Sequence, residues 1–198
     1  LLQGAAGSRV KLLVFRGNAA EPHDVVLTRE RATGAEVTSR MADATTGYLR
    51  VVEFSKATPS QLQAAIGTLA KSGASRYVVD LRGTAAGDLD DGIAAARLFV
   101  KSGTLAVKAG KTQQEVVSTA ATDGAIGAPV ALVVSQGTSG AAEVFAAALE
   151  GNDRADLIGE RTLGRTARQR LVKLPDGSGL LISNLRYLTP KSAQLHER

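Results

Sequence analysis

The feature that most constrains this chain is an alternation between short apolar runs and amphipathic stretches with helical spacing. Residues 47–54 form a run typical of a strand, and the Thr-Pro-Ser-Gln sequence at 58–61 then supplies an N-cap, a first-turn proline and a capping-box glutamine. Apolar residues recur at helical spacing as far as Gly73, which is placed to end the helix, and residues 77–81 form a second apolar run. Together these segments predict a β-α-β unit.

The same alternation continues along the chain. Helices are predicted at residues 89–100 and 141–149, and short strands at residues 105–107, 130–135 and 156–158. Near the end, a Pro-Asp-Gly turn joins two strands, which predicts a hairpin at 169–174 and 179–183, extended by 185–188. Alternating helices and buried strands predict an α/β core.

The opening of the chain has a different pattern. Residues 9–15 and 24–28 are β-rich runs joined by a polar Gly-Asn-Ala-Ala-Glu-Pro connection, which predicts a hairpin with a long loop. A hairpin alone does not make a stable domain. We place the boundary at the start of the polar stretch 33–46, giving a short unit at 1–32 and the core at 33–198. Because the sequence begins inside this strand-and-turn pattern, we expect the natural start, and any signal peptide, to precede it.

Composition excludes several function classes. The chain has 198 residues, of which 44% are hydrophobic, enough to bury the core of one domain with an extension. It contains no cysteine, which excludes disulfides, thiolate metal ligands and cysteine nucleophiles. The net charge of +5 is scattered, and only three Tyr and four Phe are available to stack on bases, so we expect no nucleic-acid partner. No apolar stretch approaches the ~20 residues of a membrane span.

Two loops that lead from a strand to a helix form the candidate site, because open α/β sheets place ligands at the carboxyl ends of strands. They are residues 82–87 (Arg-Gly-Thr-Ala-Ala-Gly) and 136–140 (Gln-Gly-Thr-Ser-Gly). The second loop feeds a helix whose first N–H groups are unpaired, a place that suits an oxyanion or a nucleophile. The simpler interpretation is that Ser139 N-caps this helix. A phosphate site is not supported, since the loop lacks the fingerprints of dinucleotide and P-loop sites.

Two other kinds of site find little support. The two histidines are His23, in the opening hairpin, and His196, near the end; neither lies beside an interior strand, which argues against a Ser-His-Asp triad. Asp88, Asp90 and Asp91 are clustered, but they fall in the first turn of a predicted helix, where negative charge is favoured electrostatically. We therefore interpret them as structural and expect neither a metal nor a cofactor.

Four motifs follow one another in order. They are residues 47–51 (Gly-Tyr-Leu-Arg-Val), 79–82 (Val-Asp-Leu-Arg), 137–143 (Gly-Thr-Ser-Gly-Ala-Ala-Glu) and 159–165 (Gly-Glu-Arg-Thr-Leu-Gly-Arg). This succession resembles the core of the carboxyl-terminal-processing, or tail-specific, serine peptidases, and the tail at 174–190 also matches.

The resemblance implies a fold and a location. The expected fold is an α/β, ClpP/crotonase-like β-α spiral core at 33–198. Residues 2–30 are similar to the end of the PDZ domain that precedes this core in the family, so residues 1–32 are expected to be its C-terminal hairpin. The family also implies a periplasmic or other extracytoplasmic location.

The resemblance assigns site positions as well. In active relatives a serine is the nucleophile and a lysine is the general base; alignment on the flanking residues puts these positions at Gly140 and Arg165. Glycine has no side chain to attack a carbonyl, and a guanidinium with a pKa above ~12 accepts no proton from a hydroxyl. The supporting glutamine of the family matches Gln169. The turn that helps to form the family's oxyanion hole is altered here to Gly-Thr-Ala-Ala-Gly at 83–87, and the N–H groups left to donate hydrogen bonds there are those of Gly87 and Ala141.

Three functions follow from these positions. The first is a pseudopeptidase that binds an extended peptide or a protein C-terminus, with Arg165 holding the terminal carboxylate. The second is an active serine peptidase in which Ser139, one residue upstream, is the nucleophile; Lys173 is the lysine nearby in sequence. The third is a member of the same fold group that binds a small ligand. The sequence does not indicate an oligomeric state.

Overall fold

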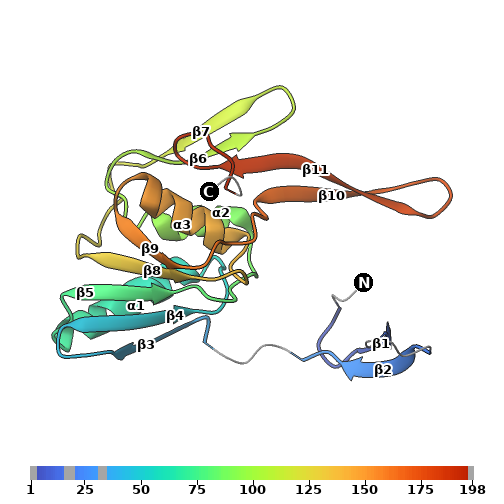
Figure 1. Cartoon of the computed structure of the whole chain (residues 1–198), viewed down its shortest axis with the longest axis horizontal. Coiled ribbons are helices and arrows are strands. Elements are labelled where there is room, and N and C mark those ends of the chain that lie inside the picture. The colour runs from blue at the N-terminus through green and yellow to red at the C-terminus, as the bar shows by residue number, and fades with distance from the viewer. Residues whose placement is uncertain (1–3, 16–20, 31–34, 196–198) are drawn as a thin grey trace. The chain divides into compact units, whose positions relative to one another are not determined.

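The computed structural model describes residues 4–15, 21–30 and 35–195. The chain divides into two compact units, residues 1–34 and 35–198 (Figure 1). The boundary expected between residues 32 and 33, most of the connection in the opening hairpin and His196 lie outside the described residues.

The first unit is built on one antiparallel hairpin of β1 (Arg9–Val14) and β2 (His23–Thr28). Its register places Leu12 opposite Val25. The predicted hairpin is confirmed, and its assignment to a PDZ domain stays a prediction.

The second unit contains a five-stranded sheet in the order β3-β4-β5-β8-β9. Strand β3 is antiparallel to β4, and the other neighbours are parallel. The strands are β3 (Val37–Met41), β4 (Thr46–Val51), β5 (Arg76–Asp80), β8 (Val130–Val134) and β9 (Ala155–Gly159). The sequence predicted four of these five strands; it missed β3, whose central residues are polar and exposed.

The helices cover one face of this sheet. They are α1 (Thr58–Lys71), α2 (Leu89–Ala96) and α3 (Ala141–Gly151). The core-facing residues Leu49, Val79 and Leu132 are fully buried, whereas Val78 and Val133, which alternate with them, are only half-buried. The predicted buried strands are therefore buried on one side only, because no helix of the described chain lies over the opposite face.

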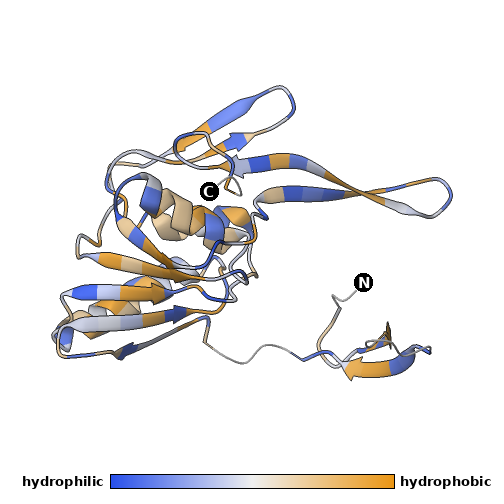
Figure 2. Ribbon diagram, viewed as in Figure 1, coloured by the Kyte–Doolittle hydropathy of each residue, from blue (hydrophilic) through white to orange (hydrophobic). Residues whose placement is uncertain are grey.

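A second sheet of four antiparallel strands has the order β10-β11-β6-β7. The strands are β6 (Thr104–Ala109), β7 (Gln114–Ser118), β10 (Ala167–Lys173) and β11 (Gly179–Leu188). The hairpin of β10 and β11 extends well beyond the rest of the unit (Figure 1); we call residues 169–183 the arm. The outer part of the arm is rich in apolar residues (Figure 2). Two apolar residues of the arm, Leu171 and Leu181, are 56% and 62% exposed.

Two helix ends test the sequence analysis. Gly73, at φ +102°, ends α1 as predicted: its N–H donates to Ala70 O at 3.0 Å and that of Ala74 to Leu69 O at 3.0 Å, the pattern of a Schellman motif. The capping box predicted at Thr58 is wrong. The N-cap is Ala57, and the buried Thr58 hydroxyl instead accepts from Ser55 N at 2.8 Å, so it is not available to cap the helix.

Candidate functional site

A cavity of about 370 Å³ lies where three loops of the second unit meet. The loops are residues 82–88, 135–140 and 159–166, and we call them the cavity loops. The residues lining the cavity are Ala85, Gly87, Asp88, Leu89, Ser139, Gly140, Arg165, Ala167 and Arg168. Four residues singled out from the sequence are thus brought together from segments up to 78 positions apart (165 − 87): Gly87, Ser139, Gly140 and Arg165.

The loop after β5 is held by hydrogen bonds from the half-buried Arg50 and the buried Thr84. Arg50, on β4, donates through Nη1 to Asp80 O and to Thr84 Oγ1, both at 2.9 Å, and through Nη2 to Arg82 O at 2.5 Å. Thr84 is fully buried, and its hydroxyl donates to Val51 O at 2.6 Å. These bonds satisfy carbonyl groups at the ends of β4 and β5 and in the turn that follows β5, so they fix the path of the backbone.

Asp80 anchors the start of the same loop. Its carboxylate accepts from Tyr48 Oη at 2.7 Å, from Arg82 Nη2 at 2.7 Å and from the Arg82 N–H at 2.9 Å. Burial by itself raises the pKa of Asp80, but the hydrogen bonds from Arg82 and Tyr48 outweigh it, and the net effect lowers the pKa well below its usual range. Asp80 is therefore a permanently ionised anchor and not a proton carrier at neutral pH.

The loop after β8 is bonded to the loop after β5. The buried Thr138 hydroxyl donates to Leu81 O at 2.8 Å and accepts from Ser135 N at 3.0 Å. Ser139 N donates to Thr84 O at 2.9 Å. Two strand-to-helix loops that are distant in sequence thus form one hydrogen-bonded wall of the cavity.

Gly140 is the N-cap of α3, with φ +65° and ψ −122°. The interpretation of Ser139 as the N-cap is wrong, because the chain turns one residue later, at a backbone conformation that glycine adopts without strain. A Cβ placed on Gly140 has room: its nearest neighbours are Ala85 O at 3.8 Å and Arg165 O at 3.9 Å. A side chain at this position fits in the space available, at the expense of backbone strain.

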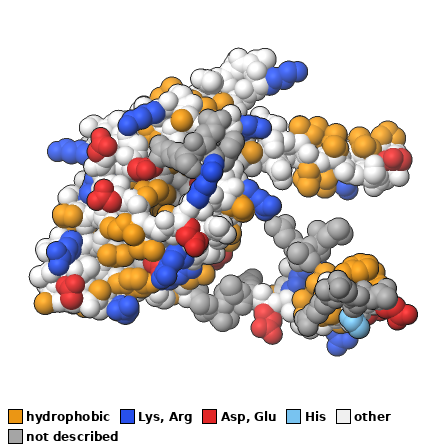
Figure 3. Space-filling model, in the orientation of Figure 1, with side chains coloured by type: hydrophobic (Ala, Val, Ile, Leu, Met, Phe, Trp, Pro, Cys, Tyr) orange, Lys and Arg blue, Asp and Glu red, His pale blue; other side chains and the backbone are white. Residues whose placement is uncertain are grey.

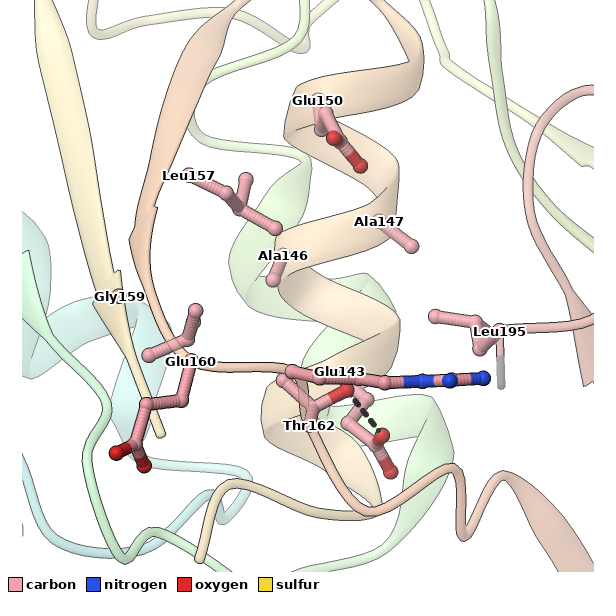
Figure 4. Close-up of a pocket in the computed structure, with 11 residues that line it drawn as sticks. Glu143, Ala146, Ala147, Glu150, Leu157, Gly159, Glu160, Thr162 and Leu195 are labelled. Atoms are coloured by element: carbon pink, nitrogen blue, oxygen red, sulfur yellow. Dashed lines mark hydrogen bonds between the residues drawn. The ribbon is translucent and has the colours of Figure 1, made fainter. Parts of the chain in front are cut away.

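Glu143 is a site residue to which the sequence analysis gave no role. It is 1% exposed, and its carboxylate accepts from Gly140 N at 3.0 Å, Gly164 N at 2.5 Å and Arg165 N at 2.8 Å. It also accepts from Thr162 Oγ1 at 2.6 Å, the bond drawn in Figure 4. This one side chain joins the start of α3 to the loop that carries Arg165. The sequence pattern that could have pointed to Glu143 is its position as the one acidic residue in the apolar segment 141–149.

A second cavity, of about 220 Å³, lies beside α3. Figure 4 shows Leu157, Ala146 and Ala147 around it, with Glu143 at one end. Glu143 therefore lines this second cavity while its carboxylate bonds the loop that carries Arg165.

The other predicted site residues do not line the main cavity. Ala141 is fully buried at the start of α3. Gln169 is exposed on β10 opposite Ser183, directly after a β-bulge. Lys173 lies opposite Gly179 at the outer end of the arm. The roles proposed for Ala141 and Gln169 remain predictions.

The first turn of α2 forms another side of the cavity. Asp88 N-caps the helix by accepting from Asp90 N at 3.0 Å. Asp90 and Asp91 lie in the first turn, as predicted. Arg168 donates to Asp88 at 2.7 Å and to Asp90 at 3.1 Å. Asp90 also accepts from Lys108 at 2.8 Å and from Tyr187 Oη at 3.0 Å.

These contacts determine the ionisation of Asp90 and Tyr187 at neutral pH. Burial raises the pKa of Asp90, but hydrogen bonds from Lys108, Tyr187 and Arg168 lower it by more. Burial raises the pKa of Tyr187, and its hydrogen bond to Asp90 raises it further. The carboxylate thus stays ionised and the phenol stays protonated at neutral pH. In the described chain, no group of three or more His, Cys, Asp or Glu side chains is arranged to hold a metal ion.

Comparison with known proteins identifies the family. Residues 45–198 match the profile of Peptidase family S41. This chain belongs to peptidase family S41.

The relatives of this S41 chain include proteins named as carboxyl-terminal-processing proteases. It is 30% identical to a carboxyl-terminal-processing protease of Synechocystis sp. over 200 residues, covering 99% of this chain and 47% of that protein. It is 31% identical to the carboxy-terminal processing protease CtpA of Bacillus subtilis, covering 100% of this chain and 42% of that protein. The chain spans about half the length of these relatives.

Solved structures confirm the predicted fold class. The chain superposes on the photosystem II D1 C-terminal processing protease with a TM-score of 0.75 at 30% identity, covering 97% of this chain and 54% of that one. An S41 protease structure from Bacteroides fragilis shares the fold with a TM-score of 0.62 at 18% identity. The second unit of this S41 chain therefore has the α/β core of the family. No described helix is long and apolar enough to cross a membrane.

Proposed function

We propose that this S41 chain binds the C-terminal segment of a protein in its main cavity and does not cleave it by the serine and lysine chemistry of its relatives. The observation that carries the proposal is the pair Gly140 and Arg165, which line one cavity and replace the nucleophile and base that the resemblance assigns there. The names of the relatives, which are carboxyl-terminal-processing proteases, support a protein C-terminus as the bound species.

The chemistry of the two residues supports binding over hydrolysis. Gly140 offers no hydroxyl for attack, and a guanidinium such as that of Arg165 donates hydrogen bonds and does not serve as a base. A guanidinium binds a carboxylate through two parallel hydrogen bonds. Among the described residues, no acidic side chain lies within salt-bridge distance of Arg165, so its charge is available to a ligand.

A second candidate is cleavage with Ser139 as the nucleophile. Ser139 is 7% exposed and lines the cavity, and its hydroxyl makes no hydrogen bond with any described residue. It lacks a base: the titratable side chains that line the cavity are Asp88, Arg165 and Arg168, and Asp88 is already bonded to Arg168. Lys173 is not a lining residue.

The third function, small-ligand binding, is supported by the fold alone. For location we propose the extracytoplasmic side, in keeping with the family.

Peptide binding tests the proposal directly. The probe is a fluorescein-labelled dodecapeptide of alternating alanine and serine with a free terminal carboxylate, measured by fluorescence anisotropy beside its C-terminally amidated form. We expect binding of the free acid, weaker binding of the amide, and loss of that difference in Arg165→Gln. Lys71→Gln, at the end of α1, is the charge-matched control. Equal binding of acid and amide by the unaltered protein would contradict the proposal.

Serine reactivity separates peptidase from pseudopeptidase. We expect no labelling of the unaltered protein by a fluorophosphonate probe and labelling of the Gly140→Ser/Arg165→Lys double variant, since the cavity has room for the added Cβ. The matched control is Gly140→Ala/Arg165→Lys, which adds the same Cβ without a hydroxyl. Labelling of the unaltered protein that disappears in Ser139→Ala establishes the second candidate instead.

A further inference from the structure

Strand β10 leads directly out of the main cavity. Arg165 lines the cavity two residues before the strand begins, and the first two residues of the strand, Ala167 and Arg168, line it as well. From there β10 continues to Lys173 along the arm. A chain held at Arg165 by its terminal carboxylate therefore has this strand as its nearest extended support.

The outer edge of β10 is free to pair. In the described chain β10 is the last strand of its sheet, with β11 on one side only. An unpaired edge presents backbone N–H and C=O groups, and extended peptides bind such edges as an added strand. Because the carboxylate end lies at the start of β10, a peptide that follows the strand runs antiparallel to it.

The charge of the edge specifies the kind of peptide. The seven residues of β10 include three basic ones and no acidic one. Arg168 is already paired with Asp88 and Asp90, but the exposed side chains of Arg170 and Lys173 have no ion-pair partner among the described residues. With Arg165, this makes three unneutralised cations between the cavity and the outer end of the strand. Arg170 and Lys173 are three residues apart, so their side chains project from opposite faces of β10.

The same charges disfavour a second copy of the chain. Antiparallel pairing of two β10 strands about their centre places Arg170 opposite Arg170 of the other copy, and like charges in directly opposite positions are destabilising. An acidic strand gains an ion pair at the same place. The charge pattern thus selects an acidic peptide over self-association.

We infer that β10 is a selectivity strand, along which the bound C-terminal segment adds antiparallel, with acidic residues facing Arg170 and Lys173. The inference rests on the proposed function. At about 3.3 Å per residue, Arg170 lies about five residues and Lys173 about eight residues from a carboxylate at Arg165. The selected ligands are protein C-termini with an acidic residue at about the fifth position before the end. Figure 3 shows hydrophobic side chains gathered on the surface of the arm. Leu171 and Leu181 are among the exposed hydrophobic residues of the arm, and they offer apolar contact to neighbouring residues of the same bound segment.

Two dodecapeptides test this inference on the full chain. Both have the alternating alanine and serine sequence with a free carboxylate; one carries Asp at the fourth to sixth positions before the end, and the other keeps its original residues there. We expect the acidic peptide to bind up to about five-fold more tightly, the value of one exposed ion pair. The preference should disappear in Arg170→Gln, remain in Lys71→Gln and weaken as salt is added.

A third peptide tests strand addition itself. N-methylation of alternate backbone amides in the acidic peptide removes the donors of an added strand and leaves its charges intact, so we expect its binding to fall to that of a peptide held by its carboxylate alone. Two outcomes overturn the inference while the proposed function stands. One is equal binding of the acidic and the neutral free-acid peptides, unchanged in Arg170→Gln. The other is binding of the N-methylated peptide as tight as that of the unmethylated acidic peptide. Failure of every free-acid peptide to bind overturns both.

Discussion

Around the main cavity the side chains that hold the backbone are buried and hydrogen-bonded, whereas the arm that leaves the same cavity presents apolar side chains to solvent. Thr84, Thr138 and Glu143 are each at most 1% exposed and together bond all three cavity loops. On the arm, Leu171 and Leu181 are opposite each other and both more than half exposed. The comparison teaches that buried hydrogen bonds hold the backbone of the three cavity loops in a definite geometry, whereas the arm depends much less on its own contacts.

The largest expected effect is at Glu143. Glu143→Ala leaves the N–H groups of Gly140, Gly164 and Arg165 and the Thr162 hydroxyl without their acceptor inside the protein, so we expect the free energy of unfolding to fall by about 3 kcal/mol or more. Urea unfolding measures the change. Glu115→Ala, at an exposed position on β7, is the control and should stay within about 0.5 kcal/mol. If both variants lost a similar amount of unfolding free energy, the buried hydrogen bonds of the cavity loops would be no more important for stability than an exposed surface residue.

Asp80 sharpens the comparison through its pH dependence. Asp80→Asn weakens the bonds from Arg82 and Tyr48, and we expect a loss of about 2 kcal/mol at pH 7. The folded pKa is lower than the ordinary value, so the contribution of Asp80 is present above about pH 3.9 and is lost as the pH falls towards the folded pKa. The unfolding free energies of the two proteins should converge in acid. Asp156→Asn, exposed on β9, controls for charge; a difference that grows below pH 4 contradicts the assignment.

Gly92 tests how closely the helices behind the cavity approach. A Cβ on Gly92 would lie 2.2 Å from Ala141 O, at the start of α3, so Gly92→Ala must push α2 away and should cost about 1–2 kcal/mol. Gly67 is the matched control in α1: a Cβ there meets nothing within 4 Å, and Gly67→Ala should stabilise by about 0.5–1 kcal/mol through helix propensity. The two substitutions are therefore predicted to have opposite signs in the same thermal unfolding assay.

The smallest effect is expected on the arm. Leu181→Ser should change the free energy of unfolding by no more than about 0.5 kcal/mol, because the side chain is 62% exposed. The fully buried Leu132, changed to Ala, should cost about 2–5 kcal/mol in the same urea experiment. A large loss for Leu181→Ser would show that the arm is packed against something in solution, and would break the comparison.

Much of the fold was predictable from local patterns. The positions of helices α1, α2 and α3 follow from apolar spacing and from the alternation of helices and strands, and the hairpin of β10 and β11 follows from its Pro-Asp-Gly turn. The helix ends were less predictable: the caps expected at Thr58 and Ser139 are wrong, and α2 ends at Ala96 and not at residue 100. Strands β3 and β7 were missed, because both are short edge strands with mostly exposed residues and are defined by pairing with β4 and β6. A polar edge strand is defined by hydrogen bonds to a strand elsewhere in the chain, and its own residues show little of the apolar alternation that predicts a strand.

The site divides in the same way. The sequence by itself determined which chemical groups are present: no side chain at Gly140, a guanidinium at Arg165 and basic residues along β10. The tertiary structure decided that these positions share a cavity, that Gly140 and not Ser139 caps α3, and that Glu143 bonds the two parts together. The physical reason is that side-chain chemistry and helical spacing are local properties, whereas the meeting of residues 87, 140 and 165 depends on hydrogen bonds formed only when distant strands are paired and the loops between them have closed.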